Sequence, residues 1–380
     1  MTFVQALIDM NSPLAKQIAE GLISVGFMRG AKKWVLLAFL FEFLWVFFFY
    51  IRRKSTTPAW VRRDSLFMVC LLLGVFLIRT PALAYAHLDV DESDWLVGAA
   101  TFYLDPYFWL SVDGTTSGPL SIIPLSLIPF FGGTLSYVSI RLFALLIYLL
   151  PGLLFTYLGL RNLCGRSIAD LVIIPLAGTV ALTQNFNAYN GEFPILFLTA
   201  LSFYLYSIPY KRSYPVLFYG LAGFVVGLFA YSKPQAIPLG AIIALGYLWK
   251  LYNERYAGAV LSSFVLGGLA PSILVSLYLT FNGLWTDFIN SYIVNNLFYG
   301  GAEGAFGNTY AFGTIVSKTL DYLLSQPEYT FWMLTGLASF MVGVFVVFTQ
   351  RHQIGKPLSR ELITALVVVA VALFCAVKPL

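Results

Sequence analysis

The chain contains ten long apolar runs, and this feature constrains its fold more than any other. Each run has 16 to 24 residues, about the length that a helix needs to cross ~30 Å of hydrocarbon at ~1.5 Å per residue. Inside a bilayer every backbone polar group must be bonded within its own segment, so these runs are expected to be helices. The predicted spans are residues 34–50, 66–86, 141–160, 168–187, 194–210, 216–232, 235–250, 258–281, 327–349 and 361–378.

The composition agrees with a membrane protein. Apolar residues make up 59% of the chain and charged residues only 11%, whereas ordinary soluble domains have about 25% charged residues. The alternation typical of outer-membrane β-barrels is absent. The three cysteines, Cys70, Cys164 and Cys375, show neither the spacing of a metal site nor a disulfide framework. The sequence therefore predicts an all-α polytopic integral membrane protein.

The basic residues predict the orientation of the spans. Fourteen of the 23 Lys and Arg residues fall in one alternate set of connections, and the positive-inside rule places that set in the cytoplasm. We expect the opposite set to face outward from the bacterial inner (plasma) membrane. The basic connections contain Arg52, Arg53, Lys54, Arg62, Arg63, Arg161, Arg166, Lys211, Arg212, Lys250, Arg255, Arg351, Lys356 and Arg360.

The predicted domain organisation is an N-terminal tail (1–33) followed by one transmembrane domain (34–380). Two outer loops, about 87–140 and 282–326, are long enough to build a site, and the apolar stretch 119–131 is expected to lie in the membrane surface or re-enter it. The cytoplasmic connections have only about 5–15 residues, like ordinary interhelical loops. No Gly-rich phosphate loop follows a strand pattern. Both observations argue against an ATP-driven pump.

An acidic cluster follows the second predicted span. It contains Asp89, Asp91, Glu92 and Asp94, with His87 before it and Trp95 after it. Carboxylates this close repel one another, so such a cluster can hold a divalent cation or can raise the pKa of one carboxylate so that it acts as a base. The alternative is a solvated acidic loop that obeys the positive-inside rule.

Several motifs on the outer side carry a family resemblance. The acidic cluster is followed by an aromatic, amphipathic segment (95–110) typical of an interfacial helix, and then by the turn Gly118-Pro119-Leu120. Asn190-Gly-Glu-Phe-Pro194 and Tyr231-Ser-Lys-Pro234 open later spans at their outer ends. Over residues 66–300 this order resembles GT-C glycosyltransferases, in the branch of protein O-mannosyltransferases and the lipid A aminoarabinose transferase. The chain departs from that pattern in having an extra span (34–50) and Trp95 where Tyr is frequent.

The resemblance implies a GT-C-like helical bundle with catalytic carboxylates. Asp91 would be the base that deprotonates the acceptor, with Glu92 as a supporting acid or as a helix cap. Glu192 would orient a sugar, or would simply favour a helix N-terminus through the helix dipole. Asp89 and Trp95 are further supporting candidates, although a solvated position is the favoured interpretation for Asp89.

The resemblance also implies a site for the donor phosphate, with Lys233, Arg79 and Arg141 as candidates. Lys233 could instead extend its ammonium to the membrane surface. Arg79 lies within a span, where charge is costly, so it is expected either to contact phosphate or to pair with an acid such as Glu92. The second outer loop interleaves Asn, aromatic and Gly residues, which suits a mobile sugar-binding lid or an ordinary aromatic belt.

The leading hypothesis is an inverting glycosyltransferase of cell-envelope polysaccharide biosynthesis. It would move a sugar from polyprenyl phosphate to a glycan, lipid or protein acceptor, with no nucleic-acid partner, no certain cofactor and a divalent cation as an open question. The alternative is a transporter or flippase for a lipid-linked sugar, which should show inverted repeats and midplane charges. A scaffold subunit of an assembly complex is a third reading, and it would tolerate loss of Asp91.

Overall fold

The computed structural model describes residues 62–83, 89–112, 114, 117–182, 186–208, 214–254, 256 and 258–300. The predicted spans 34–50, 327–349 and 361–378, the tail 1–33 and the loop beyond residue 300 lie outside these ranges. Within them the chain is mostly helical and has no β-strand, only one isolated bridge between Phe108 and Val112. The predicted all-α class is confirmed for this part of the chain.

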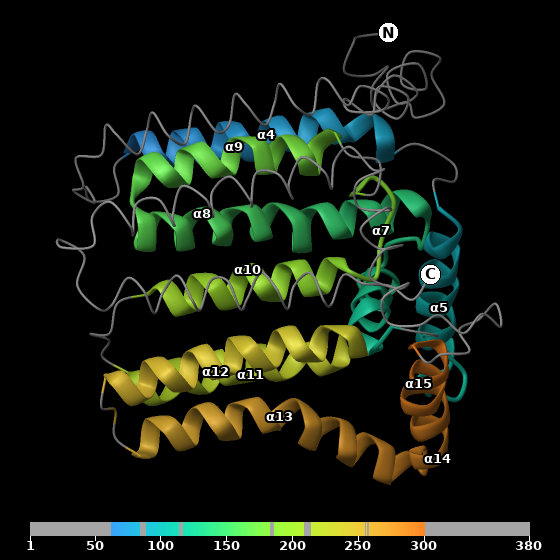
Figure 1. Cartoon of the computed structure of the whole chain (residues 1–380). Helices are drawn as coiled ribbons and strands as arrows, with labels where there is room; N and C mark the ends of the chain where they lie inside the picture. Colours follow the sequence, from blue (N-terminus) through green and yellow to red (C-terminus); the bar gives the residue numbers. More distant parts are fainter. Residues whose placement is uncertain are drawn as a thin grey trace, which may run out of the picture.

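Seven helices lie side by side with roughly parallel axes (Figure 1). Helix α9 contacts both α4 and α8, α8 contacts α10, and α11 packs closely on α13. The close α11–α13 approach depends on glycines: a Cβ on Gly223 would lie 2.0 Å from the carbonyl oxygen of Phe264. The seven are α4 (Arg62–Leu83), α8 (Leu150–Cys164), α9 (Arg166–Leu182), α10 (Phe193–Ser207), α11 (Pro215–Gly227), α12 (Ile237–Asn253) and α13 (Gly258–Asn282).

Three helical stretches in the described residues are long and apolar enough to cross a membrane. They are Asp64–Leu83, Tyr137–Cys164 and Gly258–Asn282, and each coincides with a predicted span. The stretches Val172–Ala181, Phe193–Ser207 and Pro215–Tyr231 also fall within predicted spans, but they are shorter apolar helices. A membrane protein is thus supported, whereas the number of ten spans and the GT-C fold stay predictions.

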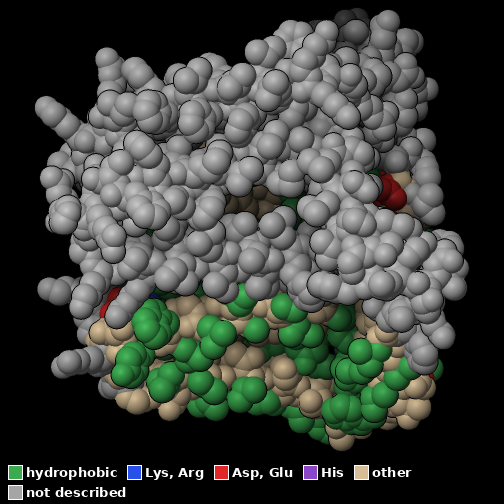
Figure 2. Space-filling view, viewed as in Figure 1, with side chains coloured by type: hydrophobic (Ala, Val, Ile, Leu, Met, Phe, Trp, Pro, Cys, Tyr) green, Lys and Arg blue, Asp and Glu red, His purple; other side chains and the backbone are tan. Residues whose placement is uncertain are grey.

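The outer surface of α13 is apolar, as expected of a helix that faces lipid. Figure 2 shows hydrophobic side chains covering the part of this face that α13 and its neighbours form. Contact with lipid hydrocarbon would remove this apolar surface from water without a protein partner. The exposed apolar residues of α13 are Leu261, Val265, Leu266, Leu269, Ile273, Leu274, Leu277 and Phe281.

Short helices form a cap across one end of the bundle (Figure 1). The cap contains both outer-loop regions as far as they are described, so segments far apart in sequence meet there. Its elements are α5 (Val90–Leu104), η1 (Pro119–Ser121), η2 (Ile123–Ser126), α6 (Leu127–Phe130), α7 (Tyr137–Phe143), α14 (Trp285–Phe288), the π-helical η7 (Ile289–Val294) and α15 (Asn295–Gly300). We call this region the cap end.

Helix α5 replaces the interfacial helix predicted for 95–110, and both boundaries have a local cause. At its start the Asp89 carboxylate accepts a hydrogen bond from the backbone N–H of Asp91 at 3.1 Å, which is a common N-cap arrangement. At its end Pro106 follows Asp105, and a proline cannot continue a helix without losing a backbone hydrogen bond. The acidic cluster therefore extends from the N-cap of α5 (Asp89) through its first turn (Asp91 and Glu92) to Asp94 in the next turn, and is not a loop before the helix.

The apolar stretch predicted to lie in or re-enter the membrane surface forms η1, η2 and α6. Together these span Pro119–Phe130, which is shorter than the helices able to cross a membrane. Pro119, Pro124 and Pro129 interrupt regular helical hydrogen bonding along it. The stretch does not add a span.

The end of the bundle opposite the cap carries a buried charge cluster. Asp64 at the start of α4 is fully buried; it accepts a hydrogen bond from Arg161 at 2.9 Å and forms an ion pair with Arg166 at 2.9 Å. Arg166 also lies 3.4 Å from Asp170, which accepts from the hydroxyl of Tyr157. These two arginines belong to the basic connections, so this described part of the basic set lies at the opposite end of the bundle from the described parts of the outer loops.

Candidate functional site

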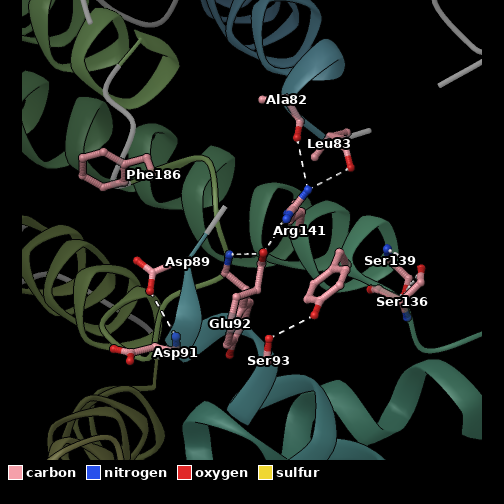
Figure 3. A network of polar contacts seen from close by, with 12 residues as sticks. Ala82, Leu83, Asp89, Asp91, Glu92, Ser93, Ser136, Ser139, Arg141 and Phe186 are labelled. Atoms are coloured by element: carbon pink, nitrogen blue, oxygen red, sulfur yellow. Dashed lines mark hydrogen bonds and ion pairs between the residues drawn. The ribbon is translucent and has the colours of Figure 1, made fainter. Parts of the chain in front are cut away.

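A buried ion pair joins two cap helices. The guanidinium of Arg141 on α7 binds both carboxylate oxygens of Glu92 on α5, with Nε 2.7 Å from Oε1 and Nη2 on Oε2. Both side chains are 0% exposed. Arg141 also donates to the carbonyls of Ala82 and Leu83, at 3.3 Å each (Figure 3). All these bonds fasten α5 and α7 to the end of α4.

Glu92 also fastens a third segment. Its Oε1 accepts the backbone N–H of Tyr189 at 2.7 Å, so the carboxylate holds α5 against the segment between α9 and α10. The Tyr189 side chain is fully buried and donates through its hydroxyl to the carbonyl of Ser121 at 2.6 Å. Burial raises the pKa of Tyr189 well above its usual range, which keeps this donor protonated.

Arg79 is buried in the same region but has other partners. Its Nη1 donates to the carbonyl of Val180 at 2.8 Å and its Nη2 to the carbonyl of Phe186. These carbonyls lie at the end of α9 and just after it, where helical partners run out. The acid predicted as its partner, Glu92, binds Arg141 instead. Arg79 is 1% exposed, and the described structure gives it the role of a helix-end cap.

The three later motifs meet one another directly. In the turn containing Gly118-Pro119-Leu120, the N–H of Gly118 donates to the carbonyl of Ser232 at 2.8 Å. The hydroxyl of Ser121 lies 3.0 Å from the carbonyl of Gly191 and 3.3 Å from that of Ser232. Motifs separated by more than 100 residues of sequence therefore form one hydrogen-bonded unit with α5.

A second ion pair lies within this unit. The ammonium of Lys233, just before η6 (Pro234–Ala236), is 2.6 Å from Oε1 of Glu192, just before α10. Unlike the first pair it reaches solvent: 13% of the Lys233 side chain and 35% of the Glu192 side chain are exposed. An ammonium has three N–H donors, so Lys233 can bind Glu192 and an anionic ligand together.

The remaining predicted residues lie on α5. Asp89, Asp91 and Asp94 are exposed, and the Asp91 side chain extends away from Arg141 (Figure 3). Trp95 is 7% exposed, and its ring borders Gly191: a Cβ on Gly191 would lie 2.9 Å from the ring. Because residues four apart share a helix face, Asp91 lies one turn from the Trp95–Gly191 contact.

Several buried polar atoms here have no hydrogen-bond partner within the described part of the chain. They are Nε1 of Trp95 and the hydroxyls of Ser117 and Ser232. The Ser117 hydroxyl and the Trp95 ring each lie 2.9 Å from the position that a Cβ on Gly191 would take. Buried donors without partners are costly and usually bind water or ligand, so the unit has spare hydrogen-bonding capacity.

Some residues of the unit carried no recognisable sequence signal. Tyr189 and Ser121 act through a backbone amide, a backbone carbonyl and a hydroxyl, which sequence patterns do not display. Tyr292 is another: it comes from η7 in the second outer loop and donates to the carbonyl of Ala230 at 2.6 Å. The order of the motifs predicted Glu192 and Lys233 as site residues, but it did not predict that they bind each other.

The described residues hold no group of three or more His, Cys, Asp or Glu side chains that could bind a metal. Of the acidic cluster, Glu92 is fully engaged by Arg141 and Tyr189. His87 and Asp113, which flank the cluster in sequence, lie outside the described residues. The described residues therefore include no candidate ligand set for a divalent cation.

Comparisons of the chain with protein-family models, with curated proteins and with solved structures gave no match.

Proposed function

We propose that the chain is a membrane-embedded glycosyltransferase of the GT-C type that takes its sugar from a polyprenyl phosphate. One observation carries the proposal: the four motifs that resemble that family are assembled into one hydrogen-bonded unit at one end of the bundle. Glu92 binds Tyr189, Gly118 binds Ser232, and Glu192 binds Lys233. Segments at one end of a helical bundle lie near one another in any case, so the support comes from the direct bonds between them.

The residues of the unit divide into a frame and a chemical set. Glu92, Arg141 and Arg79 are buried and bound on several sides, so in this proposal they form the frame. This assigns Arg141 and Arg79 to structure and leaves Lys233 as the contact for the donor phosphate. Charge-assisted bonds of an ammonium to phosphate are roughly twice as strong as neutral hydrogen bonds. Asp91 and Glu192 are the carboxylates of the unit that reach solvent, and the proposal assigns the chemistry to them.

The proposed reaction is a displacement with inversion. Asp91 accepts the proton of an acceptor hydroxyl as that oxygen attacks the anomeric carbon. The bond between the anomeric carbon and the phosphate oxygen breaks, and polyprenyl phosphate leaves as an anion beside Lys233. Glu192 holds Lys233 and is placed to bind hydroxyls of the sugar. The acceptor is a glycan, a lipid or a protein.

The placement of charge favours a lipid-linked donor over a nucleotide sugar. The unit lies at the end of the bundle opposite the basic cluster of Asp64, Arg161 and Arg166. With the basic end in the cytoplasm, the site faces the periplasm, where cytosolic nucleotide sugars are not supplied. A polyprenyl phosphate presents its head at that surface with its tail among the helices.

The test supplies the purified chain with acceptor extract and either a panel of polyprenyl-phosphate sugars or the matching nucleotide sugars. We expect transfer from at least one lipid-linked sugar and none from the nucleotide sugars alone. Transfer from a nucleotide sugar alone would refute the proposal. Failure with every lipid-linked donor, together with protein-dependent movement of those lipids across liposomes, would favour the flippase.

A further inference from the structure

The second outer loop reaches the Lys233 turn, which we define as residues 230–234, through one tyrosine. The hydroxyl of Tyr292 donates to the carbonyl of Ala230 at 2.6 Å. It is also close to the Gly118 turn, because a Cβ on Gly118 would lie 2.8 Å from this hydroxyl and 2.2 Å from the carbonyl of Tyr231. Only glycine at 118 permits this approach. Tyr292 is 6% exposed, so its bond to the turn is shielded from water.

The hydroxyl of Tyr292 is protonated at neutral pH. Burial raises the pKa of Tyr292 above its usual range, so the phenol does not ionise there. A neutral phenol can donate to a carbonyl, and a phenolate cannot. The bond from Tyr292 to the Lys233 turn is therefore present at neutral pH.

Trp109 holds Tyr292 from the other side, and it does so in a strained conformation. Its φ is +75°, and among the described residues it is the single non-glycine residue with positive φ. For a bulky side chain such a conformation is an outlier that the surroundings must impose. The Trp109 ring is 4% exposed and packs edge-on against Phe288 at 4.9 Å between centroids, with Tyr292 at 5.9 Å.

The loop that carries Trp109 is itself fixed to α13. The hydroxyl of Tyr278 donates to the carbonyl of Pro106 and accepts from the N–H of Phe108, both at 2.8 Å. The N–H of Trp109 is bonded to the carbonyl of Val112 at 2.9 Å. The backbone N–H groups of Phe108 and Trp109 are thus both bonded. The Trp109 ring packs against Phe288 of α14 and Tyr292 of η7.

We propose that Tyr292 is a positioning residue for Lys233, and that Trp109 holds Tyr292 against the Lys233 turn. The inference rests on the proposed function in one respect, the role of Lys233 as the contact for the donor phosphate. It extends the site to the second outer loop, which contributes through the backbone of Ala230 and not through a group that touches the donor. The turn is also bonded at Ser232 to Gly118 and Ser121, so loss of the Tyr292 hydroxyl loosens the turn at Ala230 without releasing it. The ammonium of Lys233 then leaves Glu192 more often.

The experiment measures acylation of individual lysines in the full-length protein, purified in detergent, with an N-hydroxysuccinimide acetate pulse and mass spectrometry. Tyr292→Phe removes one hydroxyl and keeps the ring. Tyr247→Phe is the matched control, since Tyr247 is fully buried and donates to the carbonyl of Ser202 at 2.8 Å near the other end of the bundle. Lys250, which donates to the carbonyls of Tyr206 and Ile208, is the internal reference.

We expect Tyr292→Phe to raise acylation of Lys233 relative to Lys250 by up to about fivefold, the population change of one lost hydrogen bond. Tyr247→Phe should leave Lys233 as in the parent. Trp109→Asn, which tolerates positive φ but lacks the ring, should act like Tyr292→Phe. An unchanged ratio in Tyr292→Phe, or an equal rise at both lysines, would overturn the inference.

The transfer assay supplies the second readout. With a lipid-linked donor that supports transfer, Tyr292→Phe should raise KM for that donor more than it lowers kcat, because Lys233 binds phosphate in both the substrate and the product. A fall in kcat alone would contradict a positioning role. If no lipid-linked donor supports transfer, the proposed function fails while the lysine ratio still decides the contact itself.

Discussion

The cap end holds two ion pairs, Glu92–Arg141 and Glu192–Lys233, and they differ mainly in burial. Glu92–Arg141 is 0% exposed on both sides and has further bonds to Ala82, Leu83 and Tyr189. Glu192–Lys233 is a single 2.6 Å contact with both partners partly exposed. The first pair cannot be approached by a substrate, and the second can. Burial therefore separates charges that hold the site together from charges that can act on a ligand.

The largest expected effect follows from breaking the buried pair. Glu92→Ala leaves the Arg141 guanidinium buried without its counter-ion, and loss of one partner of a buried pair costs about 3–5 kcal/mol. It also removes the acceptor for the Tyr189 N–H. We expect a large fall in the thermal unfolding temperature of the purified protein.

A double variant is the control for that prediction. Replacing both partners with apolar residues, Glu92→Leu with Arg141→Leu, removes the uncompensated charge, and such replacements are often neutral or stabilising. We expect it to recover much of the stability lost in Glu92→Ala. A double variant as unstable as the single one would show that the bonds to Ala82, Leu83 and Tyr189 matter more than the charge.

Breaking the partly exposed pair, Glu192–Lys233, should change the unfolding temperature little. Exposed pairs contribute about 0–1 kcal/mol, so Glu192→Gln and Lys233→Met should unfold close to the temperature of the parent. Their effect is expected on transfer, with Lys233→Met losing activity most at low donor concentration. A loss of stability comparable to that of Glu92→Ala would erase the distinction between the two pairs.

Much of the helical framework could be predicted from the sequence, because apolar run length and basic-residue placement act locally. The starts of α4, α10 and α13 lie within about four residues of the predicted spans. The limits predicted for the interfacial helix, 95–110, were wrong at both ends. The actual limits of α5 are set by the N-cap residue Asp89 and by Pro106, which ends the helix. Those signals were present in the sequence but were outweighed by the aromatic pattern of 95–110.

The partners of the charged residues were harder to predict, because they depend on tertiary contacts. Arg141 was predicted as a candidate contact for the donor phosphate, and the structure shows it fully buried on Glu92. Arg79 caps carbonyls at the end of α9, a partner that has no side-chain signature. Trp109 and Tyr292 lie in loops where aromatic residues are expected at any membrane surface, so their mutual packing had no distinguishing pattern.

The neighbours Asp91 and Glu92 allow the most direct test of the central claim, that the exposed carboxylate of α5 performs the chemistry while the buried one builds the frame. The measurement is the initial rate of sugar transfer from a polyprenyl-phosphate donor by purified Asp91→Asn, with its unfolding temperature recorded alongside. Asn keeps the size of Asp and loses the base, so the rate should fall by about 10²- to 10⁴-fold with little change in unfolding temperature. A rate within a few-fold of the parent would contradict the claim.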